Sequence, residues 1–134
     1  MPESGSETIL VVDDEPVLRS MAETMLARYG YQAITIGRGE EALRILDQQP
    51  DLRIDLAVLD VVMPDMSGPE LAAEIQRIRP GLRILFITGY PDQFAALAER
   101  NLPVLTKPFT SVKLIRKIRQ VLDKPQAAGS SGSA

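Results

Sequence analysis

Thr8-Ile9-Leu10-Val11-Val12-Asp13-Asp14 decides the fold, because five apolar or β-branched residues run directly into two acids. Such a run predicts a strand that is buried on both faces, as the strands of a parallel sheet are. Two further runs, Asp55-Leu56-Ala57-Val58-Leu59-Asp60 and Leu102-Pro103-Val104-Leu105-Thr106-Lys107, also end in a charged residue. The carboxyl ends of parallel strands share one edge of an open sheet, so we expect these charged groups to meet there.

The rest of the chain alternates short apolar runs with longer segments of helical periodicity. This alternation predicts βαβ units around a parallel sheet rather than a β-sandwich or a helix bundle. The expected strands cover residues 8–12, 31–36, 56–59, 83–87 and 102–106, and the expected helices begin near residue 15 and cover 40–46, 69–78, about 93–98 and 111–122. The predicted buried stripe of the first helix comprises Val17, Leu18, Met21, Ala22, Met25 and Leu26. The predicted fold is α/β, a flavodoxin-like (βα)5 sandwich of three layers with sheet order 2-1-3-4-5.

Length and composition limit the organisation and the chemistry. The 134 residues suit one domain, which we place at residues 8–123 between a disordered amino terminus, 1–7, and a flexible tail or linker, 124–134. Because the chain has no Cys and no His, it cannot use thiol nucleophiles, Cys/His zinc sites or His-dependent triads. The chemistry left to it is that of carboxylates, hydroxyls and amines.

Charge and hydropathy also predict where the chain works. The formal net charge of -3 offers no electrostatic footprint for nucleic acid, so no direct nucleic-acid partner is expected. The amino terminus lacks a basic start and an apolar stretch, and no apolar run is long enough to span a bilayer. We therefore expect a cytoplasmic protein without membrane insertion.

The acidic residues at the strand ends need a cation. Asp13 and Asp14 are adjacent and can address one site only where the strand has ended, since successive strand residues point to opposite faces. Placed beside Asp60, they cannot all stay ionised without a cation. Mg²⁺, or Mn²⁺ in its place, prefers such carboxylate oxygens.

Four motifs together resemble the receiver domain of two-component response regulators: Ile9-Leu10-Val11-Val12-Asp13-Asp14-Glu15, Asp60-Val61-Val62-Met63-Pro64-Asp65-Met66-Ser67-Gly68, Thr88, and Lys107-Pro108-Phe109. They occur in the family's order over about residues 8–123. The resemblance implies that Asp60 accepts a phosphoryl group from a histidine kinase or a histidine phosphotransfer protein. It implies that Mg²⁺ is bound directly by Asp14, largely through water by Asp13, and by Asp60 and the backbone carbonyl of Val62.

The resemblance gives Lys107 and Thr88 roles that also make physical sense. A positioned ammonium stabilises the charge that phosphoryl transfer develops, which suits Lys107. The Lys107-Pro108 bond resembles the cis linkage of the family. The hydroxyl of Thr88 can bond a new phosphoryl oxygen and draw its loop inward, so that modification biases a conformational equilibrium. The chain is then a regulator that assists its own phosphorylation and dephosphorylation rather than an enzyme.

The sequence departs from the family pattern next to the expected switch. Val104 stands where most receivers carry Tyr or Phe. Phe86-Ile87-Thr88-Gly89-Tyr90 is similar to a subgroup with a Phe-x-Thr-Gly-x-Tyr-like signature, and Tyr90 either replaces the missing aromatic or covers the loop. The stretch from Thr88 to Lys107 is shorter than usual, which predicts a fourth helix that is short, tilted or mobile. The candidate switch or output residues are Thr88, Gly89, Tyr90, Val104, Pro108 and Phe109.

Three alternative functions fit parts of the sequence. Gly37-Arg38-Gly39-Glu40-Glu41-Ala42 formally fits a dinucleotide fingerprint, but its two Glu residues would repel a pyrophosphate at the helix start. A small metal-dependent phosphotransferase would turn over phosphomonoesters. A degenerate receiver would bind partners without phosphorylation. The downstream protein is unknown, and the chain suits either a stand-alone regulator or the receiver of a hybrid kinase.

Overall fold

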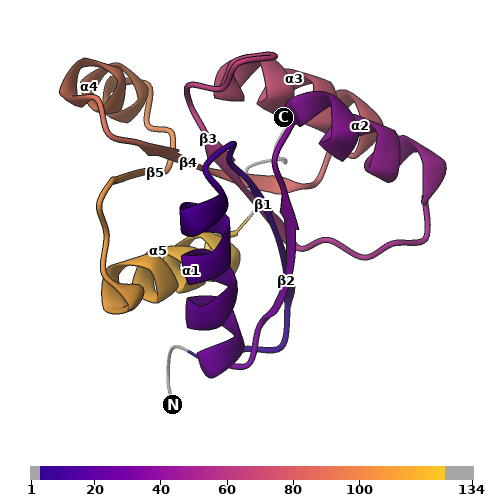
Figure 1. Cartoon of the computed structure of the whole chain (residues 1–134), viewed down its shortest axis with the longest axis horizontal. Coiled ribbons are helices and arrows are strands. Elements are labelled where there is room, and N and C mark those ends of the chain that lie inside the picture. The colour runs from indigo at the N-terminus through magenta and orange to yellow at the C-terminus, as the bar shows by residue number, and fades with distance from the viewer. Residues whose placement is uncertain (1–3, 126–134) are drawn as a thin grey trace.

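The computed structural model describes residues 4–125, and within them strands and helices alternate along the whole chain (Figure 1). The order is β1 (Thr8–Val12), α1 (Pro16–Arg28), β2 (Gln32–Ile36), α2 (Gly39–Gln48), β3 (Leu56–Asp60), α3 (Gly68–Ile78), β4 (Arg83–Thr88), α4 (Pro91–Glu99), β5 (Val104–Thr106) and α5 (Ser111–Asp123). All strand pairs are parallel, in the order β2-β1-β3-β4-β5. The flavodoxin-like sandwich and its strand order are confirmed.

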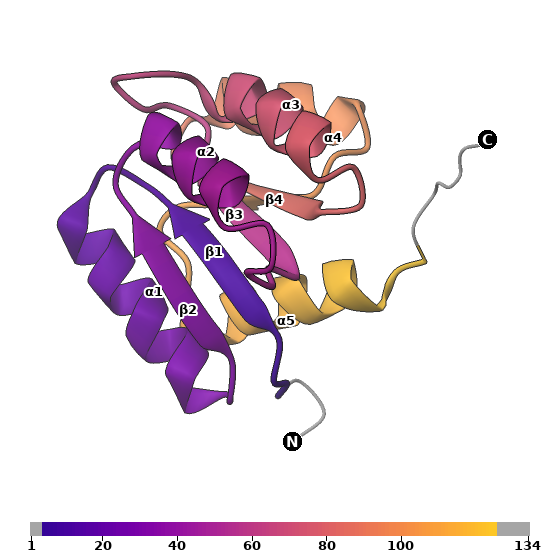
Figure 2. The same ribbon diagram turned by 90° about the vertical axis from the view of Figure 1, so that its right-hand side faces the viewer.

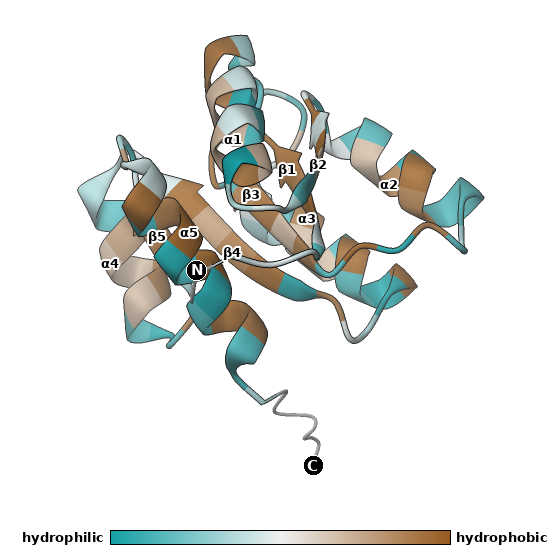
Figure 3. Cartoon of the chain, turned by 90° about the horizontal axis from the view of Figure 1, so that it is seen from below, coloured by the Kyte–Doolittle hydropathy of each residue, from teal (hydrophilic) through white to brown (hydrophobic). Residues whose placement is uncertain are grey.

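Helices cover both faces of the sheet, with α1 and α5 on one side and α2, α3 and α4 on the other (Figures 1 and 2). Alternate strand residues enter two separate cores, as the two-residue period of a strand requires. On β1, Ile9 and Val11 pack towards α1 and α5, whereas Leu10 and Val12 pack towards α2 and α3. Burial on both faces explains why apolar residues follow one another along the strands instead of alternating with polar ones. Figure 3 shows this continuous hydrophobic colouring along β3 and β4.

The element ends differ from the sequence predictions by one or two residues, for local reasons. β2 begins at Gln32 because the amide of Tyr31 still bonds the carbonyl of Leu26 at the end of α1. β5 begins at Val104 rather than 102, because the amide of Leu102 closes α4 by bonding the carbonyl of Leu97. α4 starts earlier than expected, at Pro91, a residue that suits the first turn of a helix. Its length of 9 residues agrees with the short fourth helix predicted.

The predicted buried stripe of α1 is partly wrong. Ala22 and Leu26 are buried, and Leu18 and Met25 are packed at the edge of the same core. Val17 is 72% exposed and Met21 is 48% exposed. Residues four apart share one face of a helix, and this face lies beside the one that packs on the sheet.

Residues 4–7 are tied to the end of α1 and to α5. The amide of Gly5 bonds the carbonyl of Tyr29 at 3.1 Å, and the carboxylate of Glu7 receives two bonds from Arg119, at 2.8 and 3.1 Å. Arg119 also donates to the hydroxyl of Tyr31. The predictions for residues 1–3 and for the tail beyond 125 lie outside the described residues. Within the described part of the chain, every helix is too short or too polar to cross a bilayer.

Candidate functional site

The three predicted carboxylates meet at the carboxyl edge of the sheet. Asp60 is the last residue of β3, and Asp13 follows β1, its amide continuing the ladder to the carbonyl of Ile36. Asp13 is 0% exposed and Asp60 5% exposed, whereas Asp14 is turned to solvent. One carboxylate oxygen from each of the three lies within 4.8 Å of the others. This cluster could hold a metal ion.

Lys107 reaches into the same cluster from the loop after β5. Its Nζ lies 2.9 Å from Oδ2 of Asp13, 3.3 Å from Oδ2 of Asp60 and 3.0 Å from Oε1 of Glu15. The peptide bond between Lys107 and Pro108 is cis, as the resemblance implied. The pairing with Glu15 was not foreseen, although this acid directly follows the Asp pair in sequence.

The electrostatics of the cluster oppose the charge of Asp60. Burial and the nearby charge of Asp13 together raise the pKa of Asp60 to about 6, although Lys107 acts in the opposite direction. Burial also opposes the charge of Lys107, but its close contacts with Asp13 and Glu15 outweigh this and raise its pKa above the ordinary lysine value. The amine therefore stays protonated at neutral pH, and its single positive charge does not balance the three clustered carboxylates.

The residues present fit a small divalent cation. Oδ1 of Asp13 accepts the amide of Glu15 at 2.9 Å. Oδ2 of Asp13 is buried and receives no hydrogen bond of normal geometry from any described residue, although it forms the ion pair with Lys107. A buried acceptor of this kind normally has a partner. With the oxygens of Asp14 and Asp60 beside it, the donor set is the hard, oxygen-only kind that Mg²⁺ takes.

An open hollow of about 540 Å³ gives access to these groups. It is lined by Asp14, Glu15, Asp60, Val62, Gly89, Tyr90 and Lys107. The structure thus brings together most of the residues singled out in the sequence. Pro108 and Phe109 line an adjacent hollow of about 350 Å³, together with Val17 and Met21.

Among the other switch candidates, Gly89 and Tyr90 line the hollow at the acidic cluster, whereas Thr88 and Val104 do not. Thr88 is 1% exposed at the end of β4, and its hydroxyl donates to Oε1 of Gln93 at 2.9 Å. The hydroxyl oxygen of Thr88 also accepts a hydrogen bond from the amide of Tyr90, at 3.1 Å. Val104 pairs with Phe86 in the sheet and is buried in the core beneath α3 and α4. Tyr90 is 59% exposed and lines the hollow.

The loop that follows Asp60 is anchored at both ends. Ser67 caps α3, its hydroxyl accepting the amide of Glu70 while the carboxylate of Glu70 accepts the amide of Ser67. The carboxylate of Asp65 accepts the amides of Glu40 and Gly39 at 3.0 and 3.4 Å. Asp65 therefore takes the anion position at the start of α2, which excludes a pyrophosphate there and removes the dinucleotide alternative.

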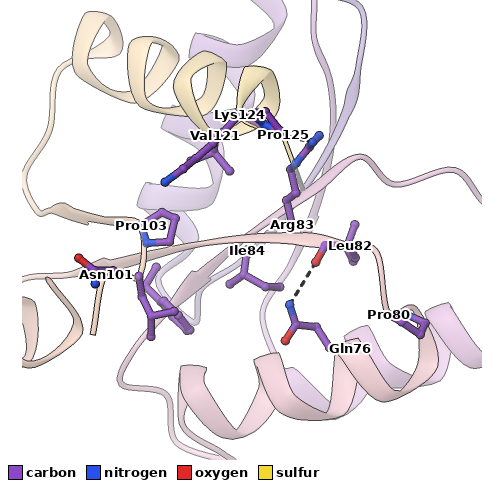
Figure 4. A pocket seen from close by; sticks show the side chains of 12 residues that line it. Gln76, Pro80, Leu82, Arg83, Ile84, Asn101, Pro103, Val121, Lys124 and Pro125 are labelled. Atoms are coloured by element: carbon purple, nitrogen blue, oxygen red, sulfur yellow. Dashed lines mark hydrogen bonds between the residues drawn. The ribbon is translucent and has the colours of Figure 1, made fainter. Parts of the chain in front are cut away.

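A third hollow, of about 380 Å³, lies at the other edge of the sheet, where β4 begins (Figure 4). Its charged lining residues are Arg83 and Lys124, and Gln76 is held by a bond to the carbonyl of Leu82. It shares no described lining residue with the hollow at the acidic cluster.

The sheet order and the acidic crevice at its carboxyl edge define a flavodoxin-like domain of the receiver type. The family model of the response regulator receiver domain matches residues 9–119, and the chain belongs to this family. It is 35% identical over 127 residues to the sensor kinase CckA of Brucella abortus, covering 90% of this chain and 13% of that protein.

The chain is also similar to a curated transcriptional regulatory protein and to a solved response regulator. The probable transcriptional regulatory protein TcrX of Mycobacterium tuberculosis is 36% identical, over 86% of this chain and 49% of that protein. The response regulator TrrA of Thermotoga maritima, solved with Mg²⁺ and BeF, is 33% identical with a TM-score of 0.75, over 87% of this chain and 99% of that one. The chain spans about half or less of the length of CckA and TcrX.

Proposed function

We propose that this chain accepts a phosphoryl group on Asp60 from a phosphohistidine of a histidine kinase or a histidine phosphotransfer protein. The observation that carries the proposal is the position of Asp60, 3.3 Å from the ammonium of Lys107 and beside the carboxylate of Asp13, which the same ammonium contacts at 2.9 Å. A carboxylate held next to a fixed ammonium can attack phosphorus while the ammonium stabilises the charge that develops on the transferred group.

In the transfer, a carboxylate oxygen of Asp60 forms the new bond to phosphorus and the bond from phosphorus to the donor imidazole nitrogen breaks. Lys107, already desolvated and held by Asp13 and Glu15, is positioned to bind an equatorial phosphoryl oxygen. Mg²⁺ or Mn²⁺ held by Asp13, Asp14, Asp60 and the carbonyl of Val62 would supply the remaining charge stabilisation.

The surroundings of the hollow favour a protein as the phosphoryl donor. Val62 and Tyr90 at its rim are 45% and 59% exposed, and Val17 and Met21 lie next to Lys107 with similar exposure. Apolar side chains around a charged centre suit a protein surface that covers the site. A phosphotransferase for small molecules would instead enclose its substrate.

Phosphorylation would act on the loop after β4. Thr88 is next to the hollow without lining it, so its hydroxyl must turn to reach a phosphoryl oxygen, and the segment Gly89–Tyr90 would move with it. An unidentified downstream protein would then recognise the changed surface.

The test is treatment with acetyl phosphate and Mg²⁺, followed by intact-mass measurement of the native chain and of Asp60→Asn. One phosphoryl group should appear on the native chain and none on Asp60→Asn, whereas Asp92→Asn, a change of the same kind on exposed α4, should still be labelled. An unlabelled native chain would favour a phosphorylation-independent binding module. Steady turnover of a phosphomonoester would favour a phosphotransferase.

A further inference from the structure

The hydroxyl of Thr88 is fully engaged before any phosphoryl group is present. It donates to Oε1 of Gln93 at 2.9 Å and accepts the amide of Tyr90 at 3.1 Å. Thr88 is 1% exposed, so water has little access to replace either partner. The bond to Gln93 joins the last residue of β4 to the first turn of α4.

The bond from Thr88 to Gln93 cannot coexist with a bond from the same hydroxyl to a phosphoryl oxygen. A threonine hydroxyl has one proton to donate. The oxygens of an acyl phosphate at neutral pH are acceptors only, as is Oε1 of Gln93. Thr88 can therefore donate to Gln93 or to a phosphoryl group, but not to both, and one bond must break before the other forms.

The remaining attachments of α4 are few, which gives the bond to Gln93 more weight. Within Pro91–Glu99, all of which the structure describes, Leu97 is the one buried residue and Phe94 is partly buried. Tyr90 gives the helix no side-chain cap. In Figure 1, α4 lies at the upper left, to one side of α2 and α3.

We propose that Gln93 is a positioning residue that stabilises the resting state by accepting the hydrogen bond of the Thr88 hydroxyl. When Thr88 releases Gln93, the first turn of α4 loosens. This inference rests on the proposed function, because the competitor for the proton is a phosphoryl group on Asp60. The signal then passes from Asp60 to α4 because the hydroxyl of Thr88 exchanges Gln93 for a phosphoryl oxygen as its acceptor. This route does not need the aromatic residue that Val104 replaces.

The experiment measures the affinity of the native chain and of Gln93→Met for beryllofluoride in the presence of Mg²⁺. Met has nearly the shape of Gln and no acceptor amide, so the cost of breaking the resting bond disappears. Affinity should rise about two- to tenfold, the equivalent of one net hydrogen bond. Gln120→Met, the same change at an exposed position of α5, should leave the affinity unchanged.

A double-mutant cycle tests whether Gln93 acts through the hydroxyl of Thr88. In a Thr88→Val background, Gln93→Met should have no further effect on beryllofluoride affinity, because the proton in question is gone. Amide exchange in the first turn of α4 should be faster in Gln93→Met without ligand, and similarly fast in the native chain with Mg²⁺ and beryllofluoride. Gln93→Ala provides a second variant, and thermal unfolding verifies that each variant is folded.

Unchanged or weaker affinity in folded Gln93→Met and Gln93→Ala would overturn the role of Gln93, and so would an effect that persists without the hydroxyl of Thr88. A native chain that neither binds beryllofluoride nor gains a phosphoryl group would overturn the proposed function itself. The two failures are thus distinguished by the native chain alone.

Discussion

A Cβ atom on Gly68 would lie 2.5 Å from the backbone carbonyl oxygen of Asp60. The amide of Gly68 also bonds the carbonyl of Val61 at 2.8 Å, so α3 begins in direct contact with the backbone that carries Asp60. Only a residue without a side chain permits this approach. The position of the Asp60 carboxylate therefore depends on how closely the start of α3 approaches the end of β3.

Gly68→Ala should lower the free energy of unfolding by about 1–3 kcal/mol, because the added methyl group displaces backbone rather than a flexible side chain. Phosphorylation of Asp60 by acetyl phosphate should slow as the carboxylate moves. Urea unfolding and labelling rates measure the two effects. Gly89→Ala is the matched control for stability, since its Cβ would meet Cβ of Lys107 at an ordinary 3.8 Å. Equal stability of both variants would show that α3 can shift freely.

The pKa of Asp60 predicts a pH dependence in metal-free protein. Burial and the charge of Asp13 raise this pKa from 3.8 to about 6, so between these pH values the folded state binds a proton that the unfolded state has lost. Stability therefore falls as pH rises through this window. Asp60→Asn cannot ionise and should be more stable than the native chain by roughly 1–3 kcal/mol at neutral pH, with the gain shrinking towards pH 4. Urea unfolding with a chelator across this range would contradict the prediction if the gain were independent of pH.

Addition of Mg²⁺ should stabilise the native chain, because the ion binds the folded cluster and not the unfolded chain. At tenfold excess over its dissociation constant the gain is about 1.4 kcal/mol, measured as a rise in Tm. Asp13→Asn removes a buried ligand and should abolish most of this rise, whereas Asp92→Asn on exposed α4 should keep it. An undiminished Mg²⁺ response in Asp13→Asn would place the cation elsewhere.

Glu7→Gln should destabilise the protein by about 1 kcal/mol, more than an isolated surface pair contributes, because Arg119 joins Glu7, Tyr31 and Asp123 in one network. The bonds from Arg119 lower the pKa of Glu7, so its stabilising effect is present above the ordinary Glu pKa of 4.5 and lost as pH falls through the lowered value. Native and Glu7→Gln chains should thus converge in strong acid. The control is Glu74→Gln, which breaks an exposed pair with Arg77 and should have little effect on urea unfolding.

The sequence was sufficient to predict the sheet order and the convergence of Asp13, Asp60 and Lys107. Strand propensity and burial are local properties, and one topological rule puts the carboxyl ends of parallel strands together. The motifs that resemble a receiver were specific for the same reason, since each lies at a strand end or in the loop that follows it. Element boundaries were accurate to within two residues, including those at turns closed by a carbonyl of the preceding helix.

Long-range contacts were decided only by the tertiary structure. Helical period shows that Val17 and Met21 share a face, but whether anything covers that face depends on how α1 lies on the sheet. Glu7 looked like part of a loose terminus, yet it is bound by Arg119, 112 residues away. The bond from Thr88 to Gln93 likewise depends on how the first turn of α4 meets the end of β4. Periodicity and motifs record what each segment prefers, whereas the partner of a polar side chain depends on which segments the fold brings within hydrogen-bonding distance.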